Sequence, residues 1–128
     1  MLNLNQETLN AVVEEACRSA AAHGRWLIAI GRAAYELEVN PYVERNPNGH
    51  GLIIGSTSGE CYSANGTCTC VAFKYGQPCY HRAMARLVRL HDEREAIRAI
   101  IEPAIDKAFA PLHERLEKAN REMAELFN

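Results

Sequence analysis

The stretch that decides the fold is residues 68–81, Cys68-Thr69-Cys70-Val71-Ala72-Phe73-Lys74-Tyr75-Gly76-Gln77-Pro78-Cys79-Tyr80-His81. In an extended segment, residues i and i+2 face the same side, so Cys68 and Cys70 can offer both sulfurs to one ion. Cys79 and His81 can share that ion only at the entrance of a helix, because side chains two apart diverge inside one. Pro78 fits this placement, and Gly76 lets the intervening loop fold back.

This donor set suits zinc, which binds thiolate and imidazole ligands in a tetrahedron. Three sulfurs and one nitrogen leave no position for water, which favours a structural ion over a catalytic one. The alternatives are an iron–sulfur cluster with Cys61 as a fourth thiolate, and ordinary buried cysteines. We expect Cys17 and Cys61 to serve in packing. We expect the remaining histidines to be solvated or to cap helices: His23, His50, His91 and His113.

The segments on either side of this stretch predict helices. Residues 7–39 have helical spacing of apolar side chains, with an end at Asn40-Pro41. Gly24 either breaks this stretch into two helices or is tolerated within one at a cost of about 1 kcal/mol. Three short strands are expected, over 52–54, from Cys61, and over 67–73. Helix resumes after Pro78 and continues to 101, and Pro103 is expected to begin a new helix. The predicted fold is α+β and mostly helical, with a small antiparallel β-hairpin or meander.

We predict a single domain in three segments: an N-terminal helical segment (1–40), a metal module (50–90) and a C-terminal helical segment (92–128). Apolar residues recur in the last segment with a 4-3-4-3-4-3 spacing, which is typical of a coiled-coil heptad seam. Pro111 lies within this seam, where a proline predicts a kink or a fresh helix start. The seam consists of Ile105, Phe109, Leu112, Leu116, Ala119, Met123 and Leu126. We expect it to pack on the N-terminal helices, and a homodimer is the alternative.

Residues 50–90 resemble the SWIM zinc finger. The resemblance rests on Cys68-Thr-Cys70-Val-Ala-Phe73, on Cys79-Tyr80-His81 leading into an Ala-rich helix, and on the preceding Gly51-Leu-Ile-Ile-Gly and Cys61-Tyr-Ser. Val71 and Ala72 stand where the family commonly has proline or aspartate, and Tyr80 stands where it has a basic residue. The resemblance implies a ββα zinc module that binds DNA or protein and is not itself catalytic.

Composition and the first residues bear on nucleic-acid binding, export and membrane association. The 128-residue chain is 48% hydrophobic and 23% charged, with a net charge of −2, so nucleic-acid binding would need a local basic patch. The first residues lack the basic and apolar regions of a secretory signal, and no apolar run is long enough to cross a bilayer. Five cysteines without an export signal argue against disulfides. We therefore expect a cytoplasmic protein without a membrane partner.

Two functions remain open. The first is protein interaction or assembly through the C-terminal seam. The second is DNA or RNA binding through Arg82, Arg86 and Arg89, which share one helix face, together with Lys74 in the metal loop. We expect no enzyme activity and no small-molecule substrate, because the chain has no phosphate loop, nucleophile elbow or zinc-protease motif. His91-Asp92-Glu93 is read as a polar helix turn.

Overall fold

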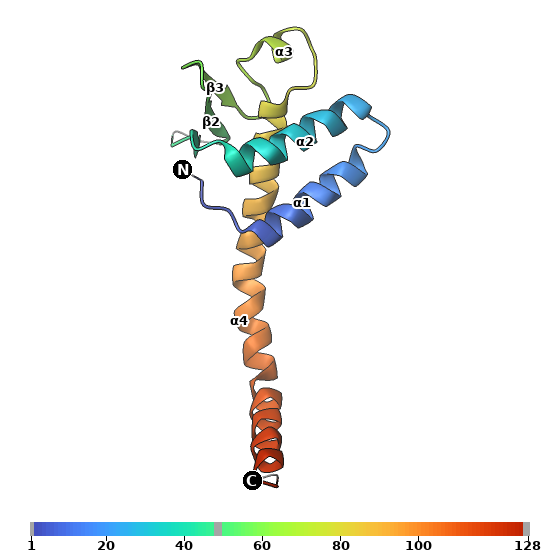
Figure 1. The fold of residues 1–128 in the computed structure, drawn as a ribbon, viewed down its shortest axis with the longest axis vertical. Coiled ribbons are helices and arrows are strands. Elements are labelled where there is room, and N and C mark those ends of the chain that lie inside the picture. The colour runs from blue at the N-terminus through green and yellow to red at the C-terminus, as the bar shows by residue number, and fades with distance from the viewer. Residues whose placement is uncertain (1, 48–49, 127–128) are drawn as a thin grey trace. The chain divides into compact units, whose positions relative to one another are not determined.

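The computed structural model describes residues 2–47 and 50–126, which belong to two compact units, 1–94 and 95–128. Four helices and three strands form the described chain (Figure 1). In chain order they are α1 (Gln6–Ser19), α2 (Gly24–Val39), β1 (Val43–Arg45), β2 (Leu52–Gly55), β3 (Cys61–Ala64), α3 (Val71–Lys74) and α4 (Tyr80–Leu126). The predicted α+β class with a small antiparallel sheet is confirmed.

The N-terminal helical segment is a pair of helices. Asn5 caps the start of α1, where its side chain accepts a hydrogen bond from the backbone N–H of Thr8 at 3.1 Å. The chain turns between Ser19 and Gly24, so the first of the two alternatives at Gly24, a break into two helices, is confirmed. The second helix ends before Asn40-Pro41, as expected from the restriction that proline imposes on the residue before it.

The sheet is antiparallel with the strand order β1-β2-β3. Ile54 pairs with Val43 on one side and with Tyr62 on the other. Gly51 precedes β2 with φ of 99°, and a Cβ there would lie 2.2 Å from the carbonyl oxygen of Ala64, so only glycine fits.

The number of strands agrees with the expectation, and two of the three lie where they were expected, β2 over 52–55 and β3 from Cys61. The strand at Val43–Arg45 was not predicted, and the strand predicted over 67–73 is wrong. Only Cys68 makes a bridge, to Ala64, and the chain then enters the helical turn α3. The backbone N–H of Lys74 bonds to the carbonyl oxygen of Cys70 at 3.3 Å. Tertiary context thus overrides the β-propensity of this Val- and Phe-containing run.

The hydrophobic core lies where the sheet and the helix pair meet the first turns of α4 (Figure 1). Leu52 and Ile54 are at most 2% exposed, and Met84 and Leu87 of α4 are equally buried. Alternate burial along β2 shows that only one face of the sheet enters the core. The same face supplies Ala64, next to the segment that carries Cys68. The core therefore holds both ends of the Cys/His stretch.

Helix α4 continues through Pro103 and Pro111, so the expected start of a new helix at Pro103 is wrong. Proline costs a helix one backbone hydrogen bond, but its fixed φ near −65° is itself helical. In residues 95–126, the side chains of the heptad seam are exposed. Among the described residues, no helix combines the length and the apolar character that crossing a membrane requires.

Candidate metal centre

Four side chains converge at the junction of the β3–α3 segment and the start of α4. The ligand atoms of Cys68, Cys70, Cys79 and His81 all lie within 4.8 Å of one another, and all four residues are buried. The structure thus brings together the four residues that the sequence nominated, and together they could hold a metal ion. A tetrahedral zinc site with Zn–S bonds of about 2.3 Å has sulfurs roughly 3.8 Å apart, which is within this range.

The second ligand pair lies at the entrance of α4, as the two-residue spacing requires. Cys79 immediately precedes the helix, and His81 lies in its first turn. The backbone N–H of Arg82 donates to Cys79 Sγ at 3.4 Å. Burial raises the pKa of Cys79, and this hydrogen bond from the helix start acts against that rise because N–H groups there favour a negative sulfur.

The first ligand pair is shaped by the turn that follows it. Cys70 is extended, with φ −81° and ψ 166°, and α3 begins at the next residue. Gly76 ends that turn with φ 69°. Its N–H bonds to Phe73 O and the N–H of Gln77 bonds to Ala72 O, both at 2.9 Å, which is a Schellman ending. This glycine therefore redirects the loop toward Cys79.

His81 is held between two aromatic rings. The Tyr62 ring stacks on it at a centroid distance of 4.4 Å, and the Tyr80 ring lies tilted at 4.1 Å. Among the described residues, neither His81 Nδ1 nor Nε2 has a hydrogen-bond partner, although both are buried. Burial, with a smaller contribution from Arg32, lowers the pKa of His81 and favours the neutral imidazole that metals bind. A buried, unpaired imidazole next to three thiols fits a metal ligand, since buried polar atoms otherwise find partners.

The three cysteines differ in how readily they ionise. Burial raises the pKa of Cys68 and of Cys79. Burial also acts to raise the pKa of Cys70, but the backbone N–H groups of Phe73 and Ala72 and the neighbouring thiols outweigh it, and the pKa is lowered. Three thiolates this close together repel one another, and a bound divalent cation would remove that penalty.

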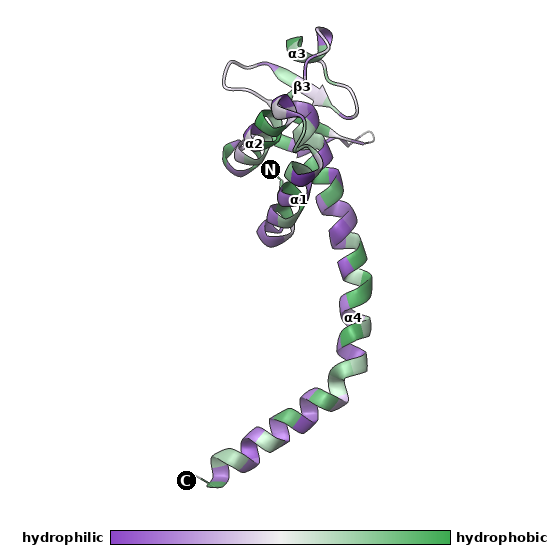
Figure 2. Cartoon of the chain, turned by 90° about the vertical axis from the view of Figure 1, so that its right-hand side faces the viewer, coloured by the Kyte–Doolittle hydropathy of each residue, from purple (hydrophilic) through white to green (hydrophobic). Residues whose placement is uncertain are grey.

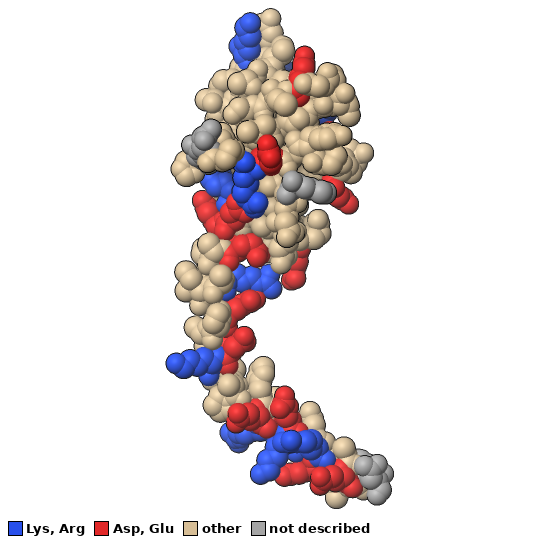
Figure 3. Space-filling view, turned by 90° about the vertical axis from the view of Figure 1, so that its left-hand side faces the viewer, with Lys and Arg blue, Asp and Glu red and all other residues tan. Residues whose placement is uncertain are grey.

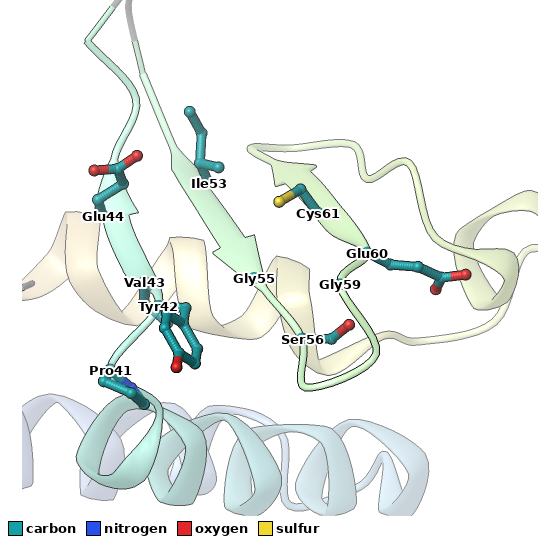
Figure 4. Close-up of a pocket in the computed structure, with 10 residues that line it drawn as sticks. All are labelled: Pro41, Tyr42, Val43, Glu44, Ile53, Gly55, Ser56, Gly59, Glu60 and Cys61. Carbon is teal, nitrogen blue, oxygen red and sulfur yellow. The ribbon is translucent and has the colours of Figure 1, made fainter.

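The other two cysteines lie outside this cluster. Cys17 is half-buried against the core, as expected. Cys61 is exposed, so the expectation that it serves in packing is wrong. It lies with Ile53 on the outer face of the sheet, at a hollow of about 390 Å³ (Figure 4). Its position excludes it from the described group of candidate ligands, which disfavours the iron–sulfur alternative.

The predicted basic stripe is partly engaged in the fold. The Arg82 guanidinium lies over the rings of Trp26 and Phe73, 5.3 and 5.1 Å from their centroids, and its Nε donates to Gly66 O at 2.9 Å. Arg89 lies 3.9 Å from Glu93, and both are exposed. Arg86 and Lys74 are exposed. In the face shown by Figure 3, basic and acidic side chains are interspersed along residues 95–126.

Sequence reasoning missed the role of His91, which is buried on α4. The backbone N–H of Asn5 donates to His91 Nε2 at 3.0 Å, so Nδ1 carries the ring proton and donates it to Asp92 at 2.9 Å. Asp92 also pairs with Arg45 of β1 at 2.8 Å. The reading of His91 as a solvated or capping residue in a polar turn is corrected: it is buried and ties the start of α1 to α4. Its spacing from Val88, three residues earlier on the buried face, was the available signal.

Comparisons of the chain with protein-family models, curated proteins and solved structures find no match. The description of the site therefore rests on its own geometry, which is that of a buried Cys/His cluster able to hold one metal ion.

Proposed function

We propose that residues 50–90 form a SWIM-like zinc module, and that its role is protein interaction or assembly. One observation carries the zinc assignment: three buried sulfurs and a buried imidazole without other partners converge to within 4.8 Å. Thiolate and imidazole are zinc donors, and four of them complete its tetrahedral shell. A closed shell offers no position to substrate, which supports a structural role.

The zinc ion would join two parts of the chain that are separate in sequence. Cys68 and Cys70 come from the segment after β3, and Cys79 and His81 come from the start of α4. The sheet has three strands of at most four residues, which is too little to be stable without support. Zinc at this point would anchor the sheet and loop to the helix that forms the core.

Exposed apolar side chains support protein interaction over nucleic-acid binding. Ile28, Tyr35 and Val39 along α2, and Tyr42 after it, are between 49% and 75% exposed. Ile28, Tyr35 and Val39 recur at seven- and four-residue spacing on one face of α2, and exposed apolar side chains that gather on one face favour an interaction site. The basic stripe offers few free positive charges to a nucleic acid. Arg82 contacts two aromatic rings and a carbonyl oxygen, and Arg89 lies near Glu93.

The zinc assignment is tested by metal analysis of the protein purified without added metal. We expect one zinc per chain, and cobalt replacement should give the visible absorption of a tetrahedral thiolate site. Cys61→Ser and Cys17→Ser are matched controls that should keep the metal, whereas Cys70→Ser should lose it. Equal metal content in all three variants would overturn the assignment.

The choice of partner class is tested by titration with single- and double-stranded nucleic acid at low salt, where phosphate contacts are strongest. We expect no binding beyond that of a charge-matched control protein. Salt-dependent binding that Arg86→Ala and Lys74→Ala weaken would instead support the nucleic-acid role.

A further inference from the structure

The heptad seam of α4 is an apolar surface. Within residues 95–126, no other side chain covers it. Its large side chains are between 47% and 79% exposed, and Ala119 is exposed as well. Figure 2 shows hydrophobic residues recurring along this part of the helix. The large ones are Ile105, Phe109, Leu112, Leu116, Met123 and Leu126. Apolar side chains repeated at this spacing are stable in water only when another helix covers them.

The sequence of this helix leaves the face that carries the seam free for another helix to pack on. With Phe109, Leu116 and Met123 at heptad position a, Pro103 and Pro111 occupy positions b and c, which point away from the seam. The a and d positions before Ile105 are Glu102 and Arg98, which form an ion pair at 2.5 Å. The apolar seam therefore begins at Ile105, and neither proline obstructs a helix packed on it.

We propose that a second copy of this chain covers the seam from Phe109 to Leu126, with the two C-terminal helices antiparallel. This deepens the proposed role in assembly and rests on it. Alignment of a with d positions then sets Phe109 against the partner's Leu126, Leu112 against the partner's Met123, and Leu116 against the partner's Ala119. The small residue faces a large one at the centre, so no layer consists of two small residues.

Charge gives a second, independent reason for this orientation. Position g is Arg115 in one heptad and Glu122 in the next. In an antiparallel pair the g positions face each other, so Arg115 meets the partner's Glu122 twice, once on each side of the symmetry axis. In a parallel pair Arg115 would face the partner's Asn120, and Ala119 would face the partner's Ala119, leaving a hole in the middle layer.

The first experiment measures self-association of the full chain by sedimentation equilibrium over a wide concentration range. We expect a monomer–dimer equilibrium that Leu116→Asp abolishes, while Arg121→Glu, on the outer face, leaves it intact. Zinc content should be equal in all of them. A chain that stays monomeric at every concentration overturns the proposal, whatever its zinc content. Loss of zinc with an intact dimer would instead contradict only the zinc assignment.

The second experiment tests the orientation with charge reversal. Arg115→Glu and Glu122→Arg should each weaken the homodimer roughly tenfold at low salt, because two attractive pairs become repulsive. Mixing the two variants should restore wild-type affinity in a heterodimer, since Glu then faces Arg in both pairs. Arg121→Glu makes the same charge change off the seam. Equal effects of Arg115→Glu and Arg121→Glu, or no rescue on mixing, would overturn the antiparallel arrangement.

Discussion

Two buried histidines on α4, ten residues apart in sequence, have opposite surroundings. His91 bonds through both ring nitrogens, to the N–H of Asn5 and to Asp92. His81 is equally buried, but neither of its nitrogens has a partner among the described residues, and three cysteine sulfurs lie beside it. His91 thus links α4 to the start of α1, whereas His81 has the surroundings of a metal ligand.

The difference teaches that burial alone does not identify a functional histidine. A buried polar atom needs a partner, and the kind of partner shows its role. The partners of His91 are the backbone N–H of Asn5 and the carboxylate of Asp92, which itself pairs with Arg45, so both ring nitrogens are satisfied without a ligand. The ring nitrogens of His81 have no such partner among the described residues, and a metal ion held by the cluster could supply one.

The largest expected effect comes from removing a sulfur ligand. Cys79→Ser should lower zinc content and melt the region around β3, α3 and the start of α4 first, because a structural zinc site contributes on the order of 10 kcal/mol to folding. Hydrogen exchange should show early loss of protection in residues 61–81. A variant that keeps one zinc per chain and normal protection would contradict the proposal that Cys79 is a zinc ligand.

Replacement of His81 tests directly whether this histidine binds the metal. His81→Ala should weaken zinc binding by more than the roughly 100-fold that loss of an outer-shell partner costs. His81→Cys should retain zinc, because four thiolates also form a tetrahedral site. Competition with a chromogenic chelator measures both affinities. If the cysteine variant bound no better than the alanine variant, His81 would act in packing and not as a ligand.

His91→Ala should behave in the opposite way. It leaves the Asn5 N–H unsatisfied and opens a cavity, so we expect a loss of about 3 kcal/mol in the free energy of unfolding. Zinc content should stay at one per chain. Urea unfolding and metal analysis check the two parts, with His113→Ala, at an exposed position, as the control. Zinc loss on mutation of His91 would contradict the proposed difference between the two histidines.

The smallest expected effect comes from the ion pair beside His91. Burial acts to raise the pKa of Asp92, but hydrogen bonds with Arg45 and His91 outweigh it and hold that pKa below its usual 3.8. The stabilisation is therefore present above this value and is lost as pH falls through the lower pKa of the folded state. Both groups are partly exposed, so it amounts to at most about 1 kcal/mol. Urea unfolding of wild type and Asp92→Asn should differ at neutral pH and converge in acid.

Local patterns carried much of the sequence prediction. The four ligand candidates were identified from type and spacing. The break between α1 and α2 was identified from Gly24, and the end of α2 from Asn40-Pro41, because these are short-range signals. The predicted strand over 67–73 failed because Cys70 starts a helical turn whose N–H groups face its sulfur. Cys61 was misjudged because alternation along a strand does not tell which face the core covers.

By itself, the sequence determined the donor set, the two N-terminal helices and the spacing of the C-terminal seam, since each depends on residues close together in the chain. Only the tertiary structure decided that Cys68 and Cys70 meet Cys79 and His81, that Arg82 lies over Trp26, and that His91 is bonded to Asn5. These contacts join segments brought together by the packing of the sheet and helices on α4. That packing depends on how all the elements fill one core, which no local pattern specifies.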